Sequence, residues 1–383
     1  MTDRQHASAT VGRPVDDLDT PALVIDVDAM QRNLEDMAAV AREAGVRLRP
    51  HTKTHKCPAI ARLQLSVGAS AITVAKVGEA EVMVAAGMGD VLIAYPILGD
   101  EKLRRVRALM ERARVRVSLD SIEVADGLGR LGLDRGEPVE VLVEVDTGHH
   151  RLGRPPGGPT AELATGIDRV AGIEVLGLLS HAGHAYRASS PGELKRIVER
   201  EGADLGETAE RCRAAGVEIR EISVGTTPTA RIEAGIGGIT ELRPGTYVFN
   251  DAQQMRLGTA TEATSAARVL TTVVARPWED RFVIDAGSKS LSSDGSDDDE
   301  TPFPGRGVIA GRPDLRLDFL TEEHGVGTQR RTEAAGAPLA IGDRLEVIPL
   351  HVCSCVNMFD VAFGIRNGSV VEEFAIAGRG RVS

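Results

Sequence analysis

The sequence predicts a (β/α)8 barrel followed by a second, mostly β domain, and three observations indicate this fold. Eight short apolar runs alternate with stretches that carry Ala, Glu, Arg and Leu at helical spacing over about 200 residues, as in a (β/α)8 barrel. No Gly-x-Gly-x-x-Gly opens a helix after the first run, so an open doubly wound sheet is the alternative rather than the first choice. Helical periodicity fades after about residue 260, which favours a mostly β remainder of the 383-residue chain.

The elements follow in order along the chain. Asp19–Asp26 is typical of a strand, and Asp28 is expected to cap an amphipathic helix that runs to about Ala44. The eight expected barrel strands lie at residues 46–49, 71–75, 90–94, 115–119, 139–145, 173–179, 218–224 and 240–243. Later strand-like runs are Ala267–Ala275, Arg281–Ile284, Leu345–Ile348 and Ser369–Ala377. The acidic segment Ser296–Pro304 is interpreted as a solvated surface loop.

Composition excludes several classes of protein. A net charge of -11 without a clustered stripe of Lys and Arg argues against a nucleic-acid partner. No apolar run is long enough to span a bilayer, and the polar start lacks the apolar core of a signal peptide. We therefore expect no membrane partner and a cytoplasmic location, where the four cysteines would be thiols or metal ligands.

The segment Arg47–Lys56 follows the first expected barrel strand and is unusually basic. Pro50 ends the strand, and Lys53 and Lys56 come directly after it together with His51 and His55. Such crowding is expected to disfavour the charged form of a lysine, which could then act as a base or form a Schiff base with a carbonyl. Taken alone, the segment is more typical of a solvated basic turn.

Polar residues follow four further expected strands, and this convergence indicates an active site. Chemistry in a barrel is found at the carboxyl ends of its strands. The four segments are Asp146–Gly153, Ser180–Tyr186, Ser223–Thr229 and Arg243–Tyr247. Within the third, Gly225, Thr226 and Thr227 combine backbone freedom with hydroxyl donors, which suits a phosphate. A plain loop is the alternative.

His351-Val-Cys353 is the candidate metal site. In an extended segment the two side chains would share a face. Imidazole and thiolate suit Zn²⁺, and two protein ligands leave positions open for water or substrate. Mn²⁺ and Co²⁺ could also occupy this pair. A half-buried strand with an incidental histidine is the alternative, and Cys355, two residues farther along, is not expected to be a ligand.

Together these motifs resemble the fold-type III pyridoxal-phosphate enzymes, within them the metal-dependent D-serine dehydratases and D-threonine aldolases. The resemblance covers nearly the whole chain. It rests on the motifs Arg49–Lys56, Asp146–Arg151, His181–Tyr186, Ser223–Thr229, Arg243–Tyr247, Asp285–Lys289, Glu323–Gly325 and His351–Cys353. The resemblance implies an alanine racemase-like barrel over residues 28–260, a β domain formed by 1–27 and 261–383 that carries the metal, and a homodimer.

The resemblance also implies roles for individual residues. Lys53 would bind pyridoxal 5'-phosphate covalently, and Arg151 would contact its pyridine ring. His351 and Cys353 would hold a divalent metal, Zn²⁺ before Mn²⁺. The other expected cofactor-binding residues are His181, Tyr186, Gly225, Thr226, Thr227 and Tyr247.

The activity implied is that of a lyase on small-molecule D-β-hydroxy amino acids. In a dehydratase Lys53 would remove the Cα proton while the metal assists loss of the β-hydroxyl. The His-x-Cys pair favours dehydration of D-serine or a related substrate, whereas the residues Ser354–Asp360 after it are closer to the aldolase pattern. D-threonine aldolase is the alternative, ahead of an amino-acid racemase or a non-catalytic cofactor-binding protein.

Overall fold

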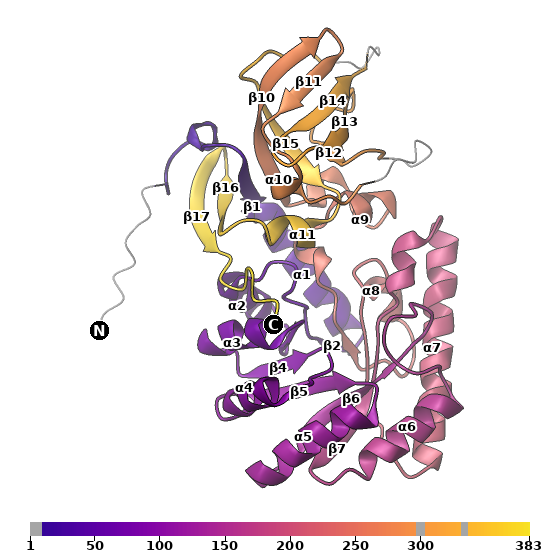
Figure 1. Cartoon of the computed structure of the whole chain (residues 1–383). Helices are drawn as coiled ribbons and strands as arrows, with labels where there is room; N and C mark the ends of the chain where they lie inside the picture. Colours follow the sequence, from indigo (N-terminus) through magenta and orange to yellow (C-terminus); the bar gives the residue numbers. More distant parts are fainter. Residues whose placement is uncertain (1–9, 296–302, 331–335) are drawn as a thin grey trace, which may run out of the picture. The chain divides into compact units, whose positions relative to one another are not determined.

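The computed structural model describes residues 10–295, 303–330 and 336–383, and the chain divides into two compact units (Figure 1). The first comprises Glu35–Gly245 with Gly380–Ser383, and the second comprises the chain up to Leu34 with Thr246–Arg379. Helix α1 (Val27–Glu43) contributes residues to both. Most of the expected acidic surface loop, residues 296–302, lies outside the described residues.

The first unit is the predicted barrel. Its eight parallel strands are hydrogen-bonded in the order β2-β9-β8-β7-β6-β5-β4-β3, and a parallel bridge from His51, just beyond β2, to Thr73 on β3 joins the two edges. The open doubly wound alternative is therefore wrong. The strands are β2 (Arg47–Leu48), β3 (Ile72–Val74), β4 (Asp90–Ile93), β5 (Arg114–Leu119), β6 (Val139–Val145), β7 (Ile173–Ser180), β8 (Glu221–Val224) and β9 (Glu241–Leu242).

Helices alternate with these strands, as the sequence pattern indicated, and cover the outside of the sheet (Figure 1). They are α2 (Pro58–Ser66), α3 (Val77–Ala85), α4 (Asp100–Met110), α5 (Ile122–Arg135), α6 (Gly158–Asp168), α7 (Pro191–Ala214) and α8 (Ala230–Glu233). Apolar strand residues contribute to the buried core, including the cluster Leu92, Leu142, Leu176 and Leu179. Burial of this apolar surface is the main term that holds the unit together.

Charged side chains fill part of the barrel interior. Arg49 and Arg116 are 1% and 2% exposed. Arg49 on the β2 side donates to Glu241 Oε2 at 2.8 Å and to Asp90 Oδ1 at 2.6 Å, and Arg116 on β5 donates to Glu221 Oε2 at 3.3 Å. The bonds to Asp90 and Glu221 connect strands that are not neighbours in the sheet, so they cross the interior. Because each guanidinium has carboxylate partners, the cost of burying its charge is offset.

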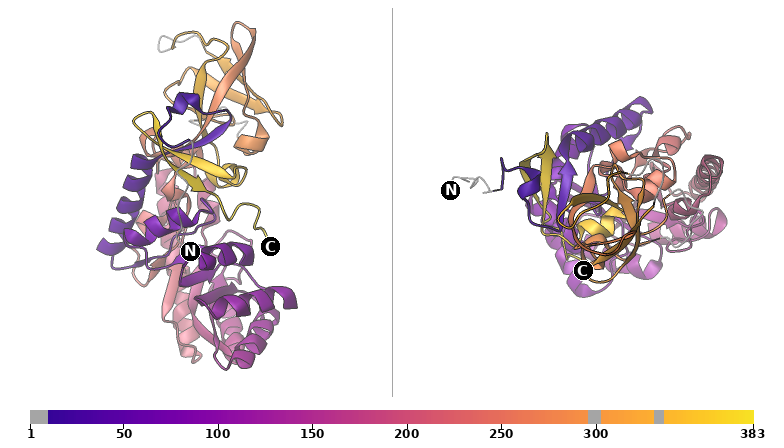
Figure 2. Two further views of the ribbon diagram at one scale, coloured as in Figure 1. Left: turned by 90° about the vertical axis from the view of Figure 1, so that its left-hand side faces the viewer. Right: turned by 90° about the horizontal axis from the view of Figure 1, so that it is seen from above.

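The second unit is mostly β, as predicted. One sheet runs β13-β14-β11-β10-β1-β16-β17, and β15 links β10 to β12. Figure 2 shows indigo β1 near the yellow C-terminal strands, of which β16 pairs with β1 and β17 pairs with β16. The strands are β1 (Ala22–Asp26), β10 (Ala267–Trp278), β11 (Arg281–Ile284), β12 (Gly307–Ile309), β13 (Leu315–Leu320), β14 (Gly325–Gln329), β15 (Arg344–Pro349), β16 (Val361–Arg366) and β17 (Ser369–Ala375). Three short helices are α9 (Ala252–Arg256), α10 (Ser288–Leu291) and α11 (Val352–Val356).

The cap of α1 differs from the prediction. Asp26 Oδ1 accepts hydrogen bonds from the backbone N–H groups of Asp28 and Ala29 at 3.0 and 2.9 Å, so Asp26 caps the helix. Asp28 lies in the first turn and pairs instead with Arg366 at 2.7 Å. The prediction for Asp28 is wrong because the last strand residue, rather than a residue two positions later, ends the extended backbone.

Candidate active site

The turn beyond β2 places Lys53 at a carboxyl end of the barrel sheet. Its backbone is held between two neighbouring segments, because His51 N–H donates to the Pro244 carbonyl at 2.9 Å and Thr52 N–H donates to the Thr73 carbonyl at 2.8 Å. Lys53 itself is half-buried, and its N–H donates to His51 Nδ1 at 3.3 Å. A lysine on such a fixed turn is positioned rather than mobile.

The turn is less positively charged than its sequence indicated. Burial lowers the pKa of His55 to about 4, and its ring accepts from the Cys57 N–H at 3.1 Å and contacts Gln64. Burial, and then the charge of Lys53, hold the pKa of His51 well below its usual range. Lys56 is 8% exposed and forms an ion pair with Glu79. Of the four potential cations, the two histidines are therefore neutral, and the positive charge of Lys56 is balanced by Glu79.

Cationic side chains from other elements, Arg151 and Arg243, lie in the same region as Lys53. His181, directly after β7, donates from Nδ1 to the Gly225 carbonyl at 2.6 Å, which leaves Nε2 as an acceptor. Burial lowers the pKa of His181 strongly, and the charges of Lys53, Arg151 and Arg243 add to the shift. His51 is affected by the same three cations. The predicted residues Lys53, Arg151, His181 and Gly225 therefore lie in one region of the barrel unit.

The loop after β6 is shaped by Asp146. Its Oδ1 accepts from the Gly148 and His150 N–H groups at 3.0 and 2.9 Å, and its Oδ2 pairs with His150 Nδ1 at 2.8 Å. These bonds fix a tight loop that ends at the exposed Arg151. His149 turns inward in the same loop, and its ring meets that of His181 edge to face with centroids 5.6 Å apart.

Two histidine nitrogens in this region lack partners. Within the part of the chain that the structure describes, the Nδ1 atoms of His149 and His184 are buried without a hydrogen bond. Gly183 leaves room for the His149 ring, because a Cβ there would lie 2.7 Å from it. Buried polar atoms are normally satisfied, so these orphaned nitrogens are consistent with a polar ligand that belongs at this site.

The remaining predicted residues of the barrel unit lie on the same rim. Gly225 lets the backbone after β8 approach Arg243, since a Cβ at Gly225 would lie 2.7 Å from the Arg243 carbonyl carbon. Thr226 and Thr227 are buried, and the Thr226 hydroxyl contacts that of Thr229. Tyr186 is half-buried in the short 3-10 helix Gly183–Arg187. A phosphate-binding role for this group stays a prediction.

The predicted metal residues lie in the second unit, together with Tyr247, which is 3% exposed. His351 and Cys353 do not belong to a strand, contrary to the expectation. β15 ends at Pro349, and His351 is the residue before helix α11, which contains Cys353. The helix nevertheless keeps the two side chains in contact. Cys355 is turned away and donates to the Ser290 carbonyl at 3.1 Å.

Acidic groups surround His351. Although burial opposes its charge, contacts with Asp294 and Cys353 raise the pKa of His351 to about 11. Burial raises the pKa of Asp251 to about 6, and this carboxyl accepts from the Val352 N–H at 3.1 Å. Cys353 Sγ lies 3.8 Å from Thr246 Oγ1. No group of three or more potential metal ligands is found among the described residues.

The sequence interpretation did not assign two residues of these regions. Arg243 was seen only as the start of a motif, yet it is 5% exposed and donates to Ser223 Oγ and the Ser180 carbonyl at 2.5 and 2.6 Å. Asp251 was not considered. The signal for Arg243 was its position directly after an expected strand, whereas nothing in the sequence separates Asp251 from an ordinary helix cap.

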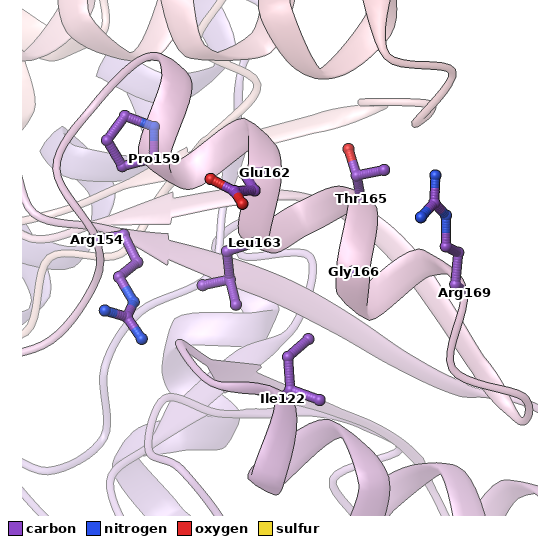
Figure 3. A pocket seen from close by; sticks show the side chains of 8 residues that line it. All are labelled: Ile122, Arg154, Pro159, Glu162, Leu163, Thr165, Gly166 and Arg169. Carbon is purple, nitrogen blue, oxygen red and sulfur yellow. The ribbon is translucent and has the colours of Figure 1, made fainter.

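A separate hollow lies among the helices of the barrel unit. Its volume is about 710 Å³, and residues of α6 and the first residue of α5, Ile122, line it (Figure 3). Arg154, Glu162 and Arg169 contribute charge. None of the predicted site residues lines this hollow. It is therefore not the expected cofactor site.

Comparison with known proteins identifies the family. The description "Alanine racemase, N-terminal domain" matches residues 25–253, and "Putative serine dehydratase domain" matches residues 266–365. The chain is 36% identical over 355 residues to the D-threo-3-hydroxyaspartate dehydratase of Delftia sp. strain HT23, covering 89% of this chain and 93% of that one.

Two solved structures are also similar over nearly their full length. D-threonine aldolase from Filomicrobium marinum matches with a TM-score of 0.90 at 34% identity, covering 98% and 99% of the two chains. A D-threo-3-hydroxyaspartate dehydratase mutant in a metal-free form matches with a TM-score of 0.86 at 33% identity, covering 95% and 98%. The chain belongs to the fold-type III pyridoxal-phosphate enzymes, as a lyase of the group that contains D-serine dehydratases and D-threonine aldolases.

Proposed function

We propose that the protein is a pyridoxal-phosphate- and metal-dependent dehydratase of D-β-hydroxy amino acids, with D-serine or a D-3-hydroxy amino acid as substrate. The observation that carries the proposal is the fixed turn of Lys53 beside neutral His51 and His181. A lysine fixed beside two neutral imidazoles, with the charge of Arg243 nearby, can act as a base or bind a cofactor covalently.

The residues present fit the cofactor. Lys53 provides an amine for the carbonyl, and the orphaned Nδ1 atoms of His149 and His184 provide unused polar contacts. Gly225 lets the backbone after β8 lie close to that of Arg243. Arg151, His181, Tyr186, Thr226, Thr227 and Tyr247 complete the proposed binding set. Pyridoxal phosphate, when bound, supplies a sink for the electrons released at Cα of the amino acid.

The metal donors also fit their role. His351 and Cys353 are a borderline-soft pair that suits Zn²⁺ before Mn²⁺, with Asp251 close by. The similarity to a dehydratase solved in a metal-free form supports a metal in this family. A divalent metal, when bound, supplies a Lewis acid for the substrate hydroxyl.

The protein's own groups would then perform the proton transfers. The Lys53 amine takes the Cα proton, and His181, neutral because of its burial, accepts a hydrogen bond without adding charge. Loss of the Cα proton and the β-hydroxyl amounts to loss of water, and hydrolysis of the unsaturated amine gives a 2-oxo acid and ammonia.

Aldol cleavage is the second candidate, favoured by the similarity to D-threonine aldolase from Filomicrobium marinum. There the β-hydroxyl rather than Cα loses the proton, the Cα–Cβ bond breaks, and glycine and an aldehyde form. We further propose that the enzyme is a cytoplasmic homodimer. Among the described residues, no helix is long and apolar enough to cross a membrane.

Product analysis tests the proposal. Protein loaded with pyridoxal phosphate and Zn²⁺ or Mn²⁺ is offered D-serine, D-threonine and D-3-hydroxyaspartate, and ammonia, 2-oxo acid, glycine and aldehyde are measured. Ammonia with pyruvate from D-serine, lost on chelation and in Cys353→Ala but not Cys355→Ala, is the expected result. Formation of glycine and acetaldehyde from D-threonine would instead show that the protein is an aldolase. Racemised substrate alone would reject both.

A further inference from the structure

Behind the predicted cofactor site, one buried carboxyl ties the ends of two barrel strands together. Glu201 of α7 is 1% exposed. Its Oε1 accepts from the Ser180 hydroxyl at 2.6 Å and from the Thr147 hydroxyl at 3.3 Å, and these two hydroxyls lie 2.8 Å apart. Ser180 ends β7 directly before His181. Thr147 belongs to the loop after β6 that leads to Arg151.

A second buried carboxyl faces the first. Glu233 of α8 is also 1% exposed, and it contacts Glu201 through its side chain. Glu201 Oε2 and both carboxyl oxygens of Glu233 are buried without an adequate donor among the described residues. Two ionised carboxylates cannot donate to each other. A single proton held between them would supply the missing donor, so the pair is best satisfied as one carboxylic acid and one carboxylate.

The surrounding charges agree with one shared proton. Burial, and then the charge of Glu201, hold the pKa of Glu233 well above its usual range, while nearby Thr229 and Arg243 act in the opposite direction. Arg243 also lies near Glu241 and Glu144, so its single positive charge is shared among four carboxyl groups. His184 faces Glu201 from the segment after β7. Two like charges held this close would not both ionise near neutral pH.

We propose that Glu201 and Glu233 form a positioning pair that shares one proton and holds Ser180 and Thr147, and through them His181 and the Arg151 loop, in place for the cofactor. This role rests on the proposed pyridoxal-phosphate site. When the pair loses its proton as the pH rises, the second negative charge separates the carboxyls and weakens the bonds from Ser180 and Thr147. The affinity for cofactor then falls as the pH rises.

The pair is testable with two variants and a matched control. Glu233→Gln keeps a permanent donor toward Glu201, and Ser180→Ala removes the short bond to Glu201 while both carboxyl groups remain. Glu207→Gln, on the exposed face of the same helix, is the control. Two measurements are made: infrared absorption of protonated carboxyl groups in cofactor-free protein, and the dissociation constant of pyridoxal phosphate by absorbance titration from about pH 7 to pH 10.

The expected results differ between variants. Near neutral pH, a protonated carboxyl band is present in the unaltered protein and in Glu207→Gln, and the part of it that belongs to the pair is lost in Glu233→Gln. Cofactor affinity of the unaltered protein falls about tenfold or more with rising pH, whereas that of Glu233→Gln stays constant. Ser180→Ala binds cofactor about tenfold more weakly throughout, as expected for one lost charged hydrogen bond.

Other outcomes would overturn the proposal. Absence of the carboxyl band rejects the shared proton, and an unchanged pH dependence in Glu233→Gln rejects its link to the cofactor. An unaltered affinity in Ser180→Ala rejects the positioning role. If the unaltered protein binds no pyridoxal phosphate, the proposed function fails together with the positioning role, but the infrared band still decides whether the carboxyls share a proton.

Discussion

Replacing Lys56 in the turn after β2 is expected to lower stability, whereas replacing Lys53 is expected to remove cofactor attachment. Lys56 is 8% exposed and pairs with Glu79, which is 1% exposed and also accepts from the Ala75 N–H at 2.7 Å. Lys56→Met leaves that carboxylate buried without its cation. Breaking a buried pair in this way costs about 3–5 kcal/mol. Lys53→Met removes a half-buried amine whose proposed role is chemical, so little stability is lost.

This loss of unfolding free energy is measurable as a lower unfolding temperature. For a unit of the size of the barrel, each kcal/mol shifts the midpoint by about 2–4 °C, so Lys56→Met is expected to unfold about 6–20 °C lower. Lys53→Met should unfold close to the unaltered temperature. Differential scanning calorimetry measures this, and absorbance after addition of pyridoxal phosphate measures covalent attachment. Attachment is expected to be lost in Lys53→Met and kept in folded Lys56→Met.

A double variant provides the control. Lys56→Met with Glu79→Leu replaces both charges by apolar groups and should recover most of the lost stability, because no uncompensated carboxylate remains. The reasoning is refuted if Lys56→Met loses covalent cofactor at full stability while Lys53→Met keeps it. It is also refuted if the double variant is no more stable than Lys56→Met, since the cost would then not come from the ion pair.

Three further predictions concern other parts of the chain. Gly177→Ala is expected to destabilise the barrel by about 1–3 kcal/mol, because its Cβ would overlap with a backbone oxygen of β8, whereas Gly206→Ala, with open space in α7, should stabilise by up to about 1 kcal/mol in chemical denaturation. Hydrogen bonds from Arg312 lower the pKa of Asp314 to about 2. About 2 kcal/mol of stability should therefore be present above pH 4 and lost as the pH falls toward 2. Acid titrations followed by circular dichroism should not show this loss in Asp314→Asn. Cys353→Ser is expected to weaken Zn²⁺ binding at least tenfold in calorimetric titration while Cys355→Ser retains it, and equal binding by both would remove Cys353 from the site.

The barrel was predictable because parallel strands covered on both faces are continuous apolar runs, and each is separated from the next by a helix. The interior charges were not, because Arg49 and Arg116 cannot be distinguished in sequence from surface arginines until the sheet closes and brings Asp90 and Glu221 near them. The second unit was harder to predict. Strands β12, β13, β14 and β16 are short or only partly buried, so their alternation is weak.

The candidate site, like the fold, could be predicted from the sequence only in part. Strand order places residues after successive strands on one rim, which brought Lys53 and His181 together as expected. The sequence could not show that Lys56 forms an ion pair, because its partner Glu79 lies 23 positions away in helix α3. His351 and Cys353 were assigned to the wrong element for a local reason. Two residues apart can share a face in a strand, but the chain turns into α11 directly after Pro349.

The pairing of β1 has a consequence for the order in which the protein is made. β1 forms ladders with β10 and β16, so its first partner is synthesised about 240 residues after it. At a synthesis rate of about 5–20 residues per second, Leu23 and Ile25 stay unpaired for roughly 12–48 s. This time is long enough for the barrel, which lies between β1 and β10 in the sequence, to form first. An apolar strand without partners invites association with other chains. Until β10 is synthesised, a chaperone that covers this short segment would therefore prevent such association.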